Sequence, residues 1–467
     1  MLGHIHLCGI DVERIADFFH GPFVDAVALE LASRLAAATI IILSLRVTRP
    51  ADENTNKKQA CSHLDQMPAP PHDSSRQKVH FVIIGQRLTV GLLLIAMALL
   101  LIRWSRKADA PQFMISSIPL NADPRGAPLS KTNFVSHDLT PMVHSATATE
   151  TKSGKLLVLW YGGEREGAKD VAIYQNEYDR TSQTWPTESV AMTRDTLRRD
   201  IHRYIKKLGN PTIGTAPDGK LWLFFVSVSF GGWSASSINL SWSDDEGKTW
   251  QPAKKIIASP FANISSLVRT PPLFFKDGGV GLATYHEMIG KFSEFLHLDA
   301  LGNVVDKSRM SWGRDAIQPM VIPSSLTNAV NFMRDSGKGE RRVWKSETED
   351  GGLSWGQIEP IEELPNPNSA VAGLRLSNGD ILLAFNDSAV YRDNMSIARS
   401  DDNGTTWRVL YSFEKVKEGG ARHKYSYPSL IQTRDGTVHL FYTWRRTKIK
   451  HVQFNQAWLE EKMRQHP

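Results

Sequence analysis

The chain has 467 residues, of which 41% are hydrophobic and 22% are charged, and it contains 13 Trp and 33 Gly. This composition is typical of a globular protein rich in turns and aromatic side chains. The formal net charge of +6 favours an anionic partner. The sequence has no heptad repeat, RNA-binding signature or zinc-finger spacing, so we expect no nucleic-acid partner. The two cysteines, Cys8 and Cys61, lie in the N-terminal region, so the rest of the chain can contain neither a disulfide nor a thiol nucleophile. We also expect neither a metal site nor a cofactor.

An apolar run, Leu88–Ile102, carries no charged residue and is followed by a basic cluster. Together with the preceding Phe81–Ile84 it predicts a transmembrane signal-anchor helix over residues 81–104, with a buried core helix as the alternative. Residues 1–80 are interpreted as a partly flexible N-terminal extension, with a second, weaker membrane helix or an interfacial helix over residues 35–46. Basic residues stand on both sides of the anchor, so the positive-inside rule leaves its orientation open.

A short polar turn followed by an apolar or aromatic strand recurs along the rest of the chain. The turns contain Asp-Gly, Asn-Gly or similar pairs, which accept the positive φ of a tight hairpin. They begin at Ser153, Asp218, Asp277, Thr327, Asn378 and Asp435. Successive turns lie roughly 50–65 residues apart, a period typical of four-stranded propeller blades. The repeat therefore predicts an all-β fold, a six-bladed β-propeller over residues 110–459 preceded by the membrane-anchor region.

A second motif, Ser/Thr-x-Asp-x-Gly-x-Thr/Ser-Trp, follows most of these strands. It occurs at Ser243–Trp250, Thr348–Trp355 and Ser400–Trp407, with a decayed copy at Tyr178–Trp185. The hydroxyl and carboxylate of this Asp box can bond local backbone donors, glycine permits the bend, and Trp can pack on a neighbouring blade. We interpret the boxes as structural turns on the outer hairpins of the blades, because this arrangement needs no ligand.

The Asp boxes and these strands together resemble the sialidase (neuraminidase) superfamily, particularly the bacterial sialidase-like proteins with BNR repeats. The similarity covers nearly all of Val143 to Leu459 and includes Leu208-Gly209-Asn210-Pro211 and Tyr425-Ser426-Tyr427-Pro428. The resemblance implies a six-bladed propeller with its site at the axial mouth. It also implies three arginines that hold a substrate carboxylate, a Tyr nucleophile activated by a Glu, and an Asp acid/base.

Two residues match this pattern and two depart from it. Tyr427 resembles the nucleophile, and Arg334 resembles one of the carboxylate-binding arginines. Gln318 stands where the resemblance implies the Glu, and an amide cannot accept the tyrosine proton. His144 stands in place of the first-blade arginine, and no arginine occurs in Asn366–Ser369, where the resemblance implies a third.

Further polar residues stand at strand ends, which converge on the mouth of a propeller. His144 and His286 are candidate general bases with Tyr427 as a partner, although each His can equally be a hydrogen-bonded structural residue. The predicted catalytic residues are Tyr427, His144, His286, Glu287, Gln318 and Asp170. The predicted substrate-binding residues are Arg165, Arg269, Arg334, Arg445, Asn210 and Asn368.

Three functions remain open on the sequence. We favour a membrane-anchored, exo-acting glycosidase, similar to an exo-alpha-sialidase, that acts on an acidic or modified sugar. The alternatives are a polysaccharide lyase, in which a His/Tyr pair removes a uronate proton, and a glycan-binding propeller without catalysis. Polymeric glycans lie outside the cell, so we expect the propeller on the periplasmic or extracellular side.

Overall fold

The computed structural model describes residues 90–91, 110–115, 126–259, 263, 265–288, 290–312, 315–416 and 419–465. The chain divides into two units, Met1–Ala98 and Leu99–Pro467, and the fold below is that of the second. No helix within the described residues is long and apolar enough to cross a membrane. Except for residues 90–91, the predicted extension and both predicted membrane helices, over residues 35–46 and 81–104, lie outside the described residues.

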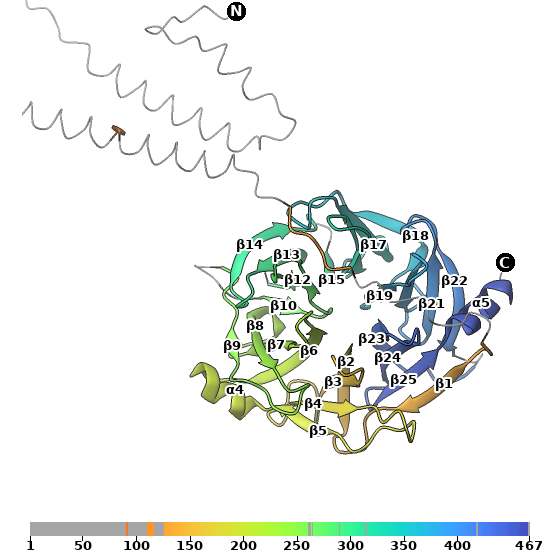
Figure 1. Ribbon diagram of the computed structural model, residues 1–467, viewed down its shortest axis with the longest axis horizontal. Coiled ribbons are helices and arrows are strands. Elements are labelled where there is room, and N and C mark those ends of the chain that lie inside the picture. The colour runs from red at the N-terminus through yellow and green to blue at the C-terminus, as the bar shows by residue number, and fades with distance from the viewer. Residues whose placement is uncertain are drawn as a thin grey trace, which may run out of the picture. The chain divides into compact units, whose positions relative to one another are not determined.

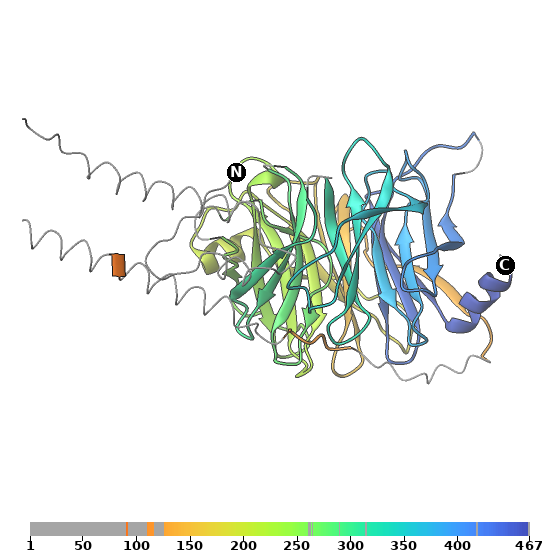
Figure 2. The ribbon, with the colours of Figure 1, turned by 90° about the horizontal axis from the view of Figure 1, so that it is seen from above.

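Six antiparallel sheets are arranged around one axis, as Figure 1 shows along that axis and Figure 2 from the side. Blade 1 is formed by β2 (Met142–Glu150), β3 (Leu156–Gly163), β4 (Ala172–Glu177) and β5 (Ser189–Met192). Blade 2 is formed by β6 (Lys207–Thr215), β7 (Leu221–Val228), β8 (Ser236–Ser243) and β9 (Lys254–Lys255). Blade 3 is formed by β10 (Leu267–Val268), β11 (Leu273–Phe274), β12 (Val280–His286), β13 (Phe292–Leu298) and β14 (Val304–Arg309).

The remaining three blades have four strands each. Blade 4 is formed by β15 (Ala316–Pro323), β16 (Ala329–Asp335), β17 (Arg342–Thr348) and β18 (Glu359–Pro365). Blade 5 is formed by β19 (Ala372–Arg375), β20 (Ile381–Phe385), β21 (Met395–Ser400) and β22 (Arg408–Glu414). Blade 6 is formed by β23 (Tyr425–Gln432), β24 (Val438–Trp444), β25 (Lys448–Phe454) and β1 (Ser130–Phe134). The predicted six-bladed, all-β propeller is confirmed.

Helical segments are few in the described part of the chain. The helix α4 (Arg194–Ile201) joins blades 1 and 2 and is capped by the Thr193 side chain, which accepts from the amide of Thr196. A single 3-10 turn, η2 (Trp233–Ala235), follows β7, and α5 (Gln456–Gln465) follows β25. In blade 3, Pro271 and Pro272 separate β10 from β11, because proline lacks the amide donor that a continuous strand requires.

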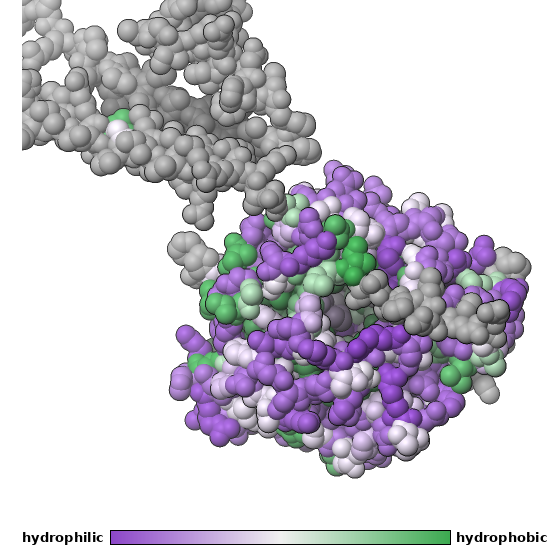
Figure 3. Space-filling view, viewed as in Figure 1, coloured by the Kyte–Doolittle hydropathy of each residue, from purple (hydrophilic) through white to green (hydrophobic). Residues whose placement is uncertain are grey.

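Two kinds of turn lie at one end of the propeller: the Gly turns, and the Asp boxes of blades 2, 4 and 5 with the decayed copy in blade 1. The predicted Gly turns join the first two strands, and their glycines take positive φ, as at Gly154 (90°) and Gly219 (98°). The Asp boxes join the third and fourth strands, as between β8 and β9. Since the strands are antiparallel, both sets of turns lie on one face, which we call the turn face. Figure 3 shows this face, which is mostly hydrophilic and is hollowed near its centre.

The opposite face, which we call the mouth face, carries the beginnings of the first strands, the ends of the second strands and the loops that follow them. The second strands β3 and β7 are buried along their whole length, because neighbouring blades cover both sides of each sheet. The Asp-box tryptophans add contacts between blades. Trp250 of blade 2, for example, donates to Gln175 of blade 1 over 2.9 Å.

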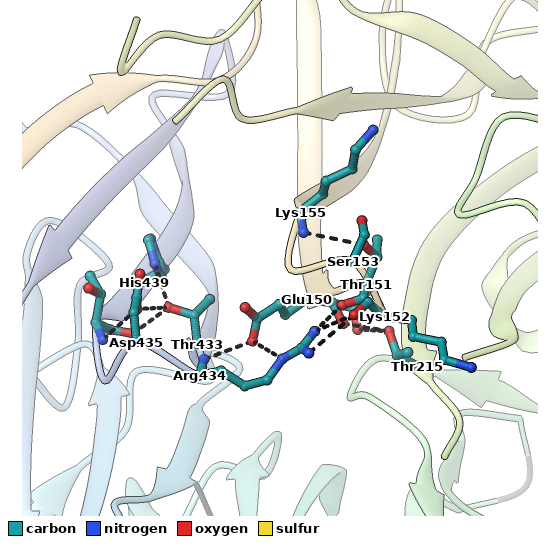
Figure 4. A network of polar contacts seen from close by, with 12 residues as sticks. Glu150, Thr151, Lys152, Ser153, Lys155, Thr215, Thr433, Arg434, Asp435 and His439 are labelled. Carbon is teal, nitrogen blue, oxygen red and sulfur yellow. Dashed lines mark hydrogen bonds and ion pairs between the residues drawn. The ribbon is translucent and has the colours of Figure 1, made fainter. Parts of the chain in front are cut away.

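The ring closes through the first strand of the propeller. β1 pairs with β25, with Ser130 opposite Phe454, so residues from both ends of the propeller segment share blade 6. On the turn face, Arg434 of blade 6 bonds the backbone carbonyls of Thr151 and Lys152 in blade 1 and lies 3.3 Å from the Glu150 carboxylate (Figure 4).

Candidate functional site

One non-glycine residue with positive φ stands at or just before the first strand of every blade, near the mouth face. These residues are Ser145, Asn210, Ser265, Gln318, Asn368 and Tyr427, with φ between 44° and 58°. In four blades they coincide with a shift of strand register, which marks a β-bulge. A bulge changes the direction in which the side chain points. The left-handed conformation of a non-glycine residue costs roughly 1–2 kcal/mol of free energy. Such strain gathers at functional sites.

Tyr427 lies at the centre of a hydrogen-bonded cluster on the axis. Gln318 Nε2 donates to the Tyr427 hydroxyl over 3.3 Å, and Arg334 Nη1 approaches the same oxygen at 3.5 Å. Arg334 Nη1 also donates to Gln318 Oε1 over 3.0 Å. The Gln318 amide and Asn210 Nδ2 both donate to Tyr285 Oη, each over 3.2 Å. The structure therefore brings together four of the predicted site residues and adds Tyr285.

Three guanidinium groups surround this phenol. Arg334 Nε donates to Asn368 Oδ1 over 2.7 Å, and Arg392 donates to the backbone carbonyl of the same Asn368. The Cζ atom of the buried Arg269 lies 5.1 Å from the centroid of the Tyr427 ring. Within the part of the chain that the structure describes, none of the three forms an ion pair with a carboxylate. Such unneutralised guanidinium groups are suited to an anionic ligand.

The arginines change the acidity of Tyr427. Burial opposes ionisation of the phenol, but Arg334, the hydrogen bond from Gln318 and Arg392 outweigh it and lower the pKa of Tyr427. Burial, with smaller contributions from neighbouring charges, raises the pKa of Tyr285. Burial also lowers the pKa of Arg269 to about 10. Gln318 bonds both phenols, and of the two Tyr427 therefore ionises more readily.

His144 packs directly on Tyr427, with ring centroids 4.2 Å apart. Its Nδ1 lies 2.9 Å from Thr443 Oγ1. Burial and the positive charges of Arg446 and Arg269 hold the pKa of His144 well below its usual value. The imidazole is therefore neutral at physiological pH, and it adds no further positive charge to the cluster.

A carboxylate reaches the edge of the cluster from the loop after β3. Glu166 Oε2 accepts from Arg446 Nη1 over 2.6 Å, and Glu166 Oε1 accepts from Trp233 Nε1 over 3.2 Å. The sequence analysis named Arg445 instead of Arg446. Arg445 is exposed and lies on the Trp444 ring, with its Cζ atom 4.1 Å from the ring centroid.

His286 and Glu287 occupy a different environment from Tyr427. His286 Nε2 lies 2.7 Å from Glu294 Oε2, and its ring stacks on Phe292 at 4.5 Å. Successive side chains of a strand point to opposite sides, so Tyr285, and not His286, faces the cluster. The amide of Glu287 donates to Ser265 Oγ over 2.8 Å.

Arg165 and Asp170 lie exposed in the loop after β3. Asp170 Oδ2 accepts from the amide of Glu164 over 2.7 Å, so this carboxylate shapes its own loop. Among the described residues, no group of three His, Cys, Asp or Glu side chains is arranged to hold a metal ion.

The sequence analysis missed Arg392, Arg446 and Tyr285. Arg392 follows the second strand of blade 5 on the mouth face, and Arg334 is the last residue but one of the second strand of blade 4. A search for arginines at or after second strands would have found both. The segment before β19, where the resemblance implies a third arginine, instead supplies Asn368, which binds these two arginines.

The blades, the Asp boxes and the axial Tyr–Arg cluster define the chain as a sialidase-like β-propeller with BNR repeats. Residues 154–440, more than half of the chain, match the family model of the BNR repeat-like domain, and the chain belongs to that family. The predicted membership of the sialidase-like superfamily is confirmed. No curated protein matches the chain in sequence.

Solved structures of the same fold include enzymes of different specificity. A Hadza microbial sialidase superposes with a TM-score of 0.58 at 17% identity, covering 69% of this chain and 68% of that one. A leech intramolecular trans-sialidase gives 0.56 at 12% identity, covering 71% and 70%. An α-L-arabinanase of Penicillium chrysogenum gives 0.52 at 14% identity, covering 71% and 99%. At these identities the likeness concerns the fold alone.

Proposed function

We propose that the chain is an exo-acting glycosidase that removes a terminal acidic sugar, with Tyr427 as nucleophile. One observation carries this proposal. Arg334 and Arg392 meet at Asn368, beside Tyr427, and neither forms an ion pair among the described residues. A sugar carboxylate can bind these guanidinium forks, and a phenol avoids the repulsion that a carboxylate nucleophile would meet at an anionic sugar.

Activation of the nucleophile in this proposal is electrostatic. Gln318 cannot take the Tyr427 proton, but the arginines lower the pKa of that phenol and favour its anion. The Tyr427 oxygen forms a bond to the anomeric carbon while the bond to the leaving oxygen breaks and that oxygen takes a proton. Water then cleaves the sugar–tyrosine bond.

The proton donor in this proposal comes from the loop after β3. Asp170, one of the catalytic residues predicted from the sequence, is the candidate, and Glu166 is the alternative, since its carboxylate is bound to Arg446 beside the cluster. An Asp170→Asn variant is expected to lose turnover of substrates with poor leaving groups and to retain much of it with an activated aryl leaving group. An equal loss with both substrates would contradict an acid role for Asp170.

A lyase is the second candidate, favoured by the absence of a Glu at position 318 and by the neutral His144 packed on Tyr427. In this reaction the Tyr427 phenolate takes the C5 proton of a uronate and a C4–C5 double bond forms. The C4 oxygen leaves with a proton from the Tyr427 hydroxyl, which restores the phenolate. The product absorbs ultraviolet light, whereas hydrolysis yields a new reducing end without that absorbance.

The test is a panel of acidic glycans assayed with both readouts. Tyr427→Phe is expected to lower turnover by at least about 1000-fold. Tyr411→Phe, on β22 away from the cluster, is the matched control. Unchanged turnover in Tyr427→Phe would remove Tyr427 from either mechanism. Glycan binding without turnover in the wild-type chain would favour a binding propeller.

We propose in addition that residues 81–104 anchor the propeller to a membrane, with the propeller on the periplasmic or extracellular side. The support is the uncharged run Leu88–Ile102. Protease added to intact cells, or to spheroplasts for a periplasmic propeller, is then expected to digest the propeller. Protection of the propeller until the cytoplasmic membrane is broken would contradict this orientation.

A further inference from the structure

Exposed aromatic side chains are concentrated on the mouth face. Among the described residues, the exposed Phe, Tyr and Trp side chains are Phe134, Tyr204, Phe230, Trp312, Tyr391 and Tyr411. All except Tyr411 lie at the mouth-face ends of strands or in mouth-face loops. Phe230 and Trp312 are each 75% exposed. Exposed rings gathered on one face of a molecule mark an interaction surface.

These rings, or rings beside them, are paired with cations in four blades. Lys207 Nζ lies 3.8 Å from the Trp233 ring centroid in blade 2, in the same mouth-face region as Phe230. In blade 3, Arg309 Cζ lies 3.5 Å from the Phe292 centroid and 4.8 Å from that of Trp312.

Blades 5 and 6 repeat the arrangement. Arg422 Cζ lies 3.7 Å from the Tyr391 centroid, and Arg445 Cζ lies 4.1 Å from that of Trp444. Trp444 in turn packs on Phe134 at 5.4 Å. Some of this charge is locally balanced, since Arg422 pairs with Asp393 at 2.7 Å. We call these four groupings the aromatic–cation stations.

The chemistry of the stations identifies their ligand. An aromatic ring stacks on the apolar face of a sugar ring, and a guanidinium or ammonium group binds a carboxylate or sulfate beside it. Two stations are connected to the axial cluster. Trp233 bonds Glu166, which holds Arg446, and Tyr391 directly precedes Arg392. These two stations therefore border the axial cluster that contains Tyr427.

We infer that the mouth face binds an acidic polysaccharide chain, and that the aromatic–cation stations hold sugar units adjoining the unit at Tyr427. This inference rests on the proposed function for the position of the terminal unit. It goes further in assigning a polymeric substrate and in giving roles to Phe230, Trp312 and Arg445, which do not contact Tyr427.

The experiment measures binding instead of turnover. The full chain in detergent is titrated calorimetrically with polygalacturonate, with polysialic acid and with neutral dextran. The wild-type chain is expected to bind at least one acidic polymer and not to bind dextran. The double variant Phe230→Ala, Trp312→Ala is expected to weaken that binding about tenfold.

Leu301→Ala is the matched control, because Leu301 is 74% exposed but lies in the turn between β13 and β14, on the turn face. Its affinity is expected to equal that of the wild type. Circular dichroism and the thermal transition establish that each variant is folded.

Several outcomes would overturn the inference. They are equal affinity of the double variant and the wild type, equal binding of dextran, and no binding of either acidic polymer. The proposed catalytic role of Tyr427 and the proposed polysaccharide-binding surface can be disproved independently of each other. If turnover survives Tyr427→Phe but the double variant still weakens polymer binding, the nucleophile assignment is wrong and the binding surface stands.

Discussion

At the scale of single residues, the amide of Gln318 explains how the axial cluster keeps its positive charge. Its oxygen accepts from Arg334, and its nitrogen donates to both Tyr427 and Tyr285. A carboxylate at this position would pair with Arg334 and could not donate to the two phenols. Gln318 therefore leaves the charge of Arg334 available to an anionic ligand and to the Tyr427 phenolate.

Gln318→Glu is accordingly expected to raise the pKa of Tyr427, because it removes a hydrogen bond to the phenolate and adds a negative charge beside it. Ultraviolet titration of the phenol measures the pKa, with the Tyr427→Phe form of each variant subtracted. Gln318→Leu removes the hydrogen bond without adding charge and should give a smaller rise. A fall in the pKa of Tyr427 in Gln318→Glu would contradict this account.

At the scale of structural elements, each Asp box is a small hydrogen-bonded unit. In the box of blade 2, Asp245 accepts from the Ser243 hydroxyl and from both the amide and the hydroxyl of Thr249. Hydrogen bonds from Thr249 and Ser243 lower the pKa of Asp245 to about 2. The Ser243 hydroxyl accepts from the amide of Gly247, so one turn satisfies several backbone donors.

Asp245→Ala is expected to lower the free energy of unfolding by about 1 kcal/mol, because these donors lose their acceptor, although water partly replaces it at this accessible turn. Urea denaturation measures the loss. Asp244→Ala removes a neighbouring carboxylate that is exposed and lies 3.7 Å from Lys220, and it should change stability little. Similar losses in both variants would refute a special role for the box aspartate.

A hydrogen-bond chain with a fixed direction runs from Trp185 of blade 1 into blade 6. Trp185 Nε1 donates to His451 Nδ1, His451 Nε2 lies 2.9 Å from His439 Nδ1, and His439 Nε2 lies 3.2 Å from Thr433 Oγ1. The Thr433 hydroxyl donates to Asp435. Indole is a donor and carboxylate an acceptor, so both imidazoles are neutral and each donates from Nε2. Protonation of either ring would place two donors against each other.

The free energy of unfolding is therefore expected to fall in acid. Burial lowers the pKa of His439 to about 4 and holds that of His451 well below its usual value. Below about pH 6.5 the histidines of the unfolded chain bind protons, whereas those of the folded chain stay neutral. Their contribution to the free energy of unfolding is therefore fully present above about pH 6.5 and is lost as the pH falls toward 4. The loss from His439 alone is of the order of 3 kcal/mol.

Urea denaturation between pH 7.5 and pH 4.5 measures this dependence. The double variant His439→Phe, His451→Phe should flatten it, whereas His202→Asn, at an exposed histidine, should not. An unchanged slope in the double variant would show that other groups cause the loss.

At the scale of the whole molecule, the ring depends on the seam between blades 6 and 1. Within blade 6, β1 pairs with β25, and the chain runs on from β1 into blade 1. Across the seam, Arg434 of blade 6 bonds the Thr151 and Lys152 carbonyls of blade 1 on the turn face (Figure 4). Elsewhere in the ring, consecutive blades follow one another along the chain. At this seam the neighbouring strands come from opposite ends of the propeller segment.

Arg434→Ala is expected to lower the free energy of unfolding by about 1–2 kcal/mol, because the carbonyls of blade 1 lose their donor, although water partly replaces it at this half-exposed side chain. Thermal and urea denaturation measure the change. Arg408→Ala, at an exposed arginine of β22, is the control and should leave stability near that of the parent chain. A larger loss in the control would contradict the importance of the seam.

The amino-acid sequence by itself determined the number of blades, the positions of the Gly turns and Asp boxes, and the superfamily. These features are local, since each depends on residues a few positions apart that fix a backbone turn. It also identified Tyr427, Gln318, Arg334 and Asn210, which stand in short phrases of that superfamily.

Only the tertiary structure decided which other side chains meet at the axis. The site takes residues from all six blades, and the direction of each side chain depends on strand parity. Bulges at residues such as Gln318 and Tyr427 interrupt that parity. Counting along the sequence therefore placed Arg445 and His286 at the site, whereas the fold brought Arg446 and Tyr285 there and added Arg392.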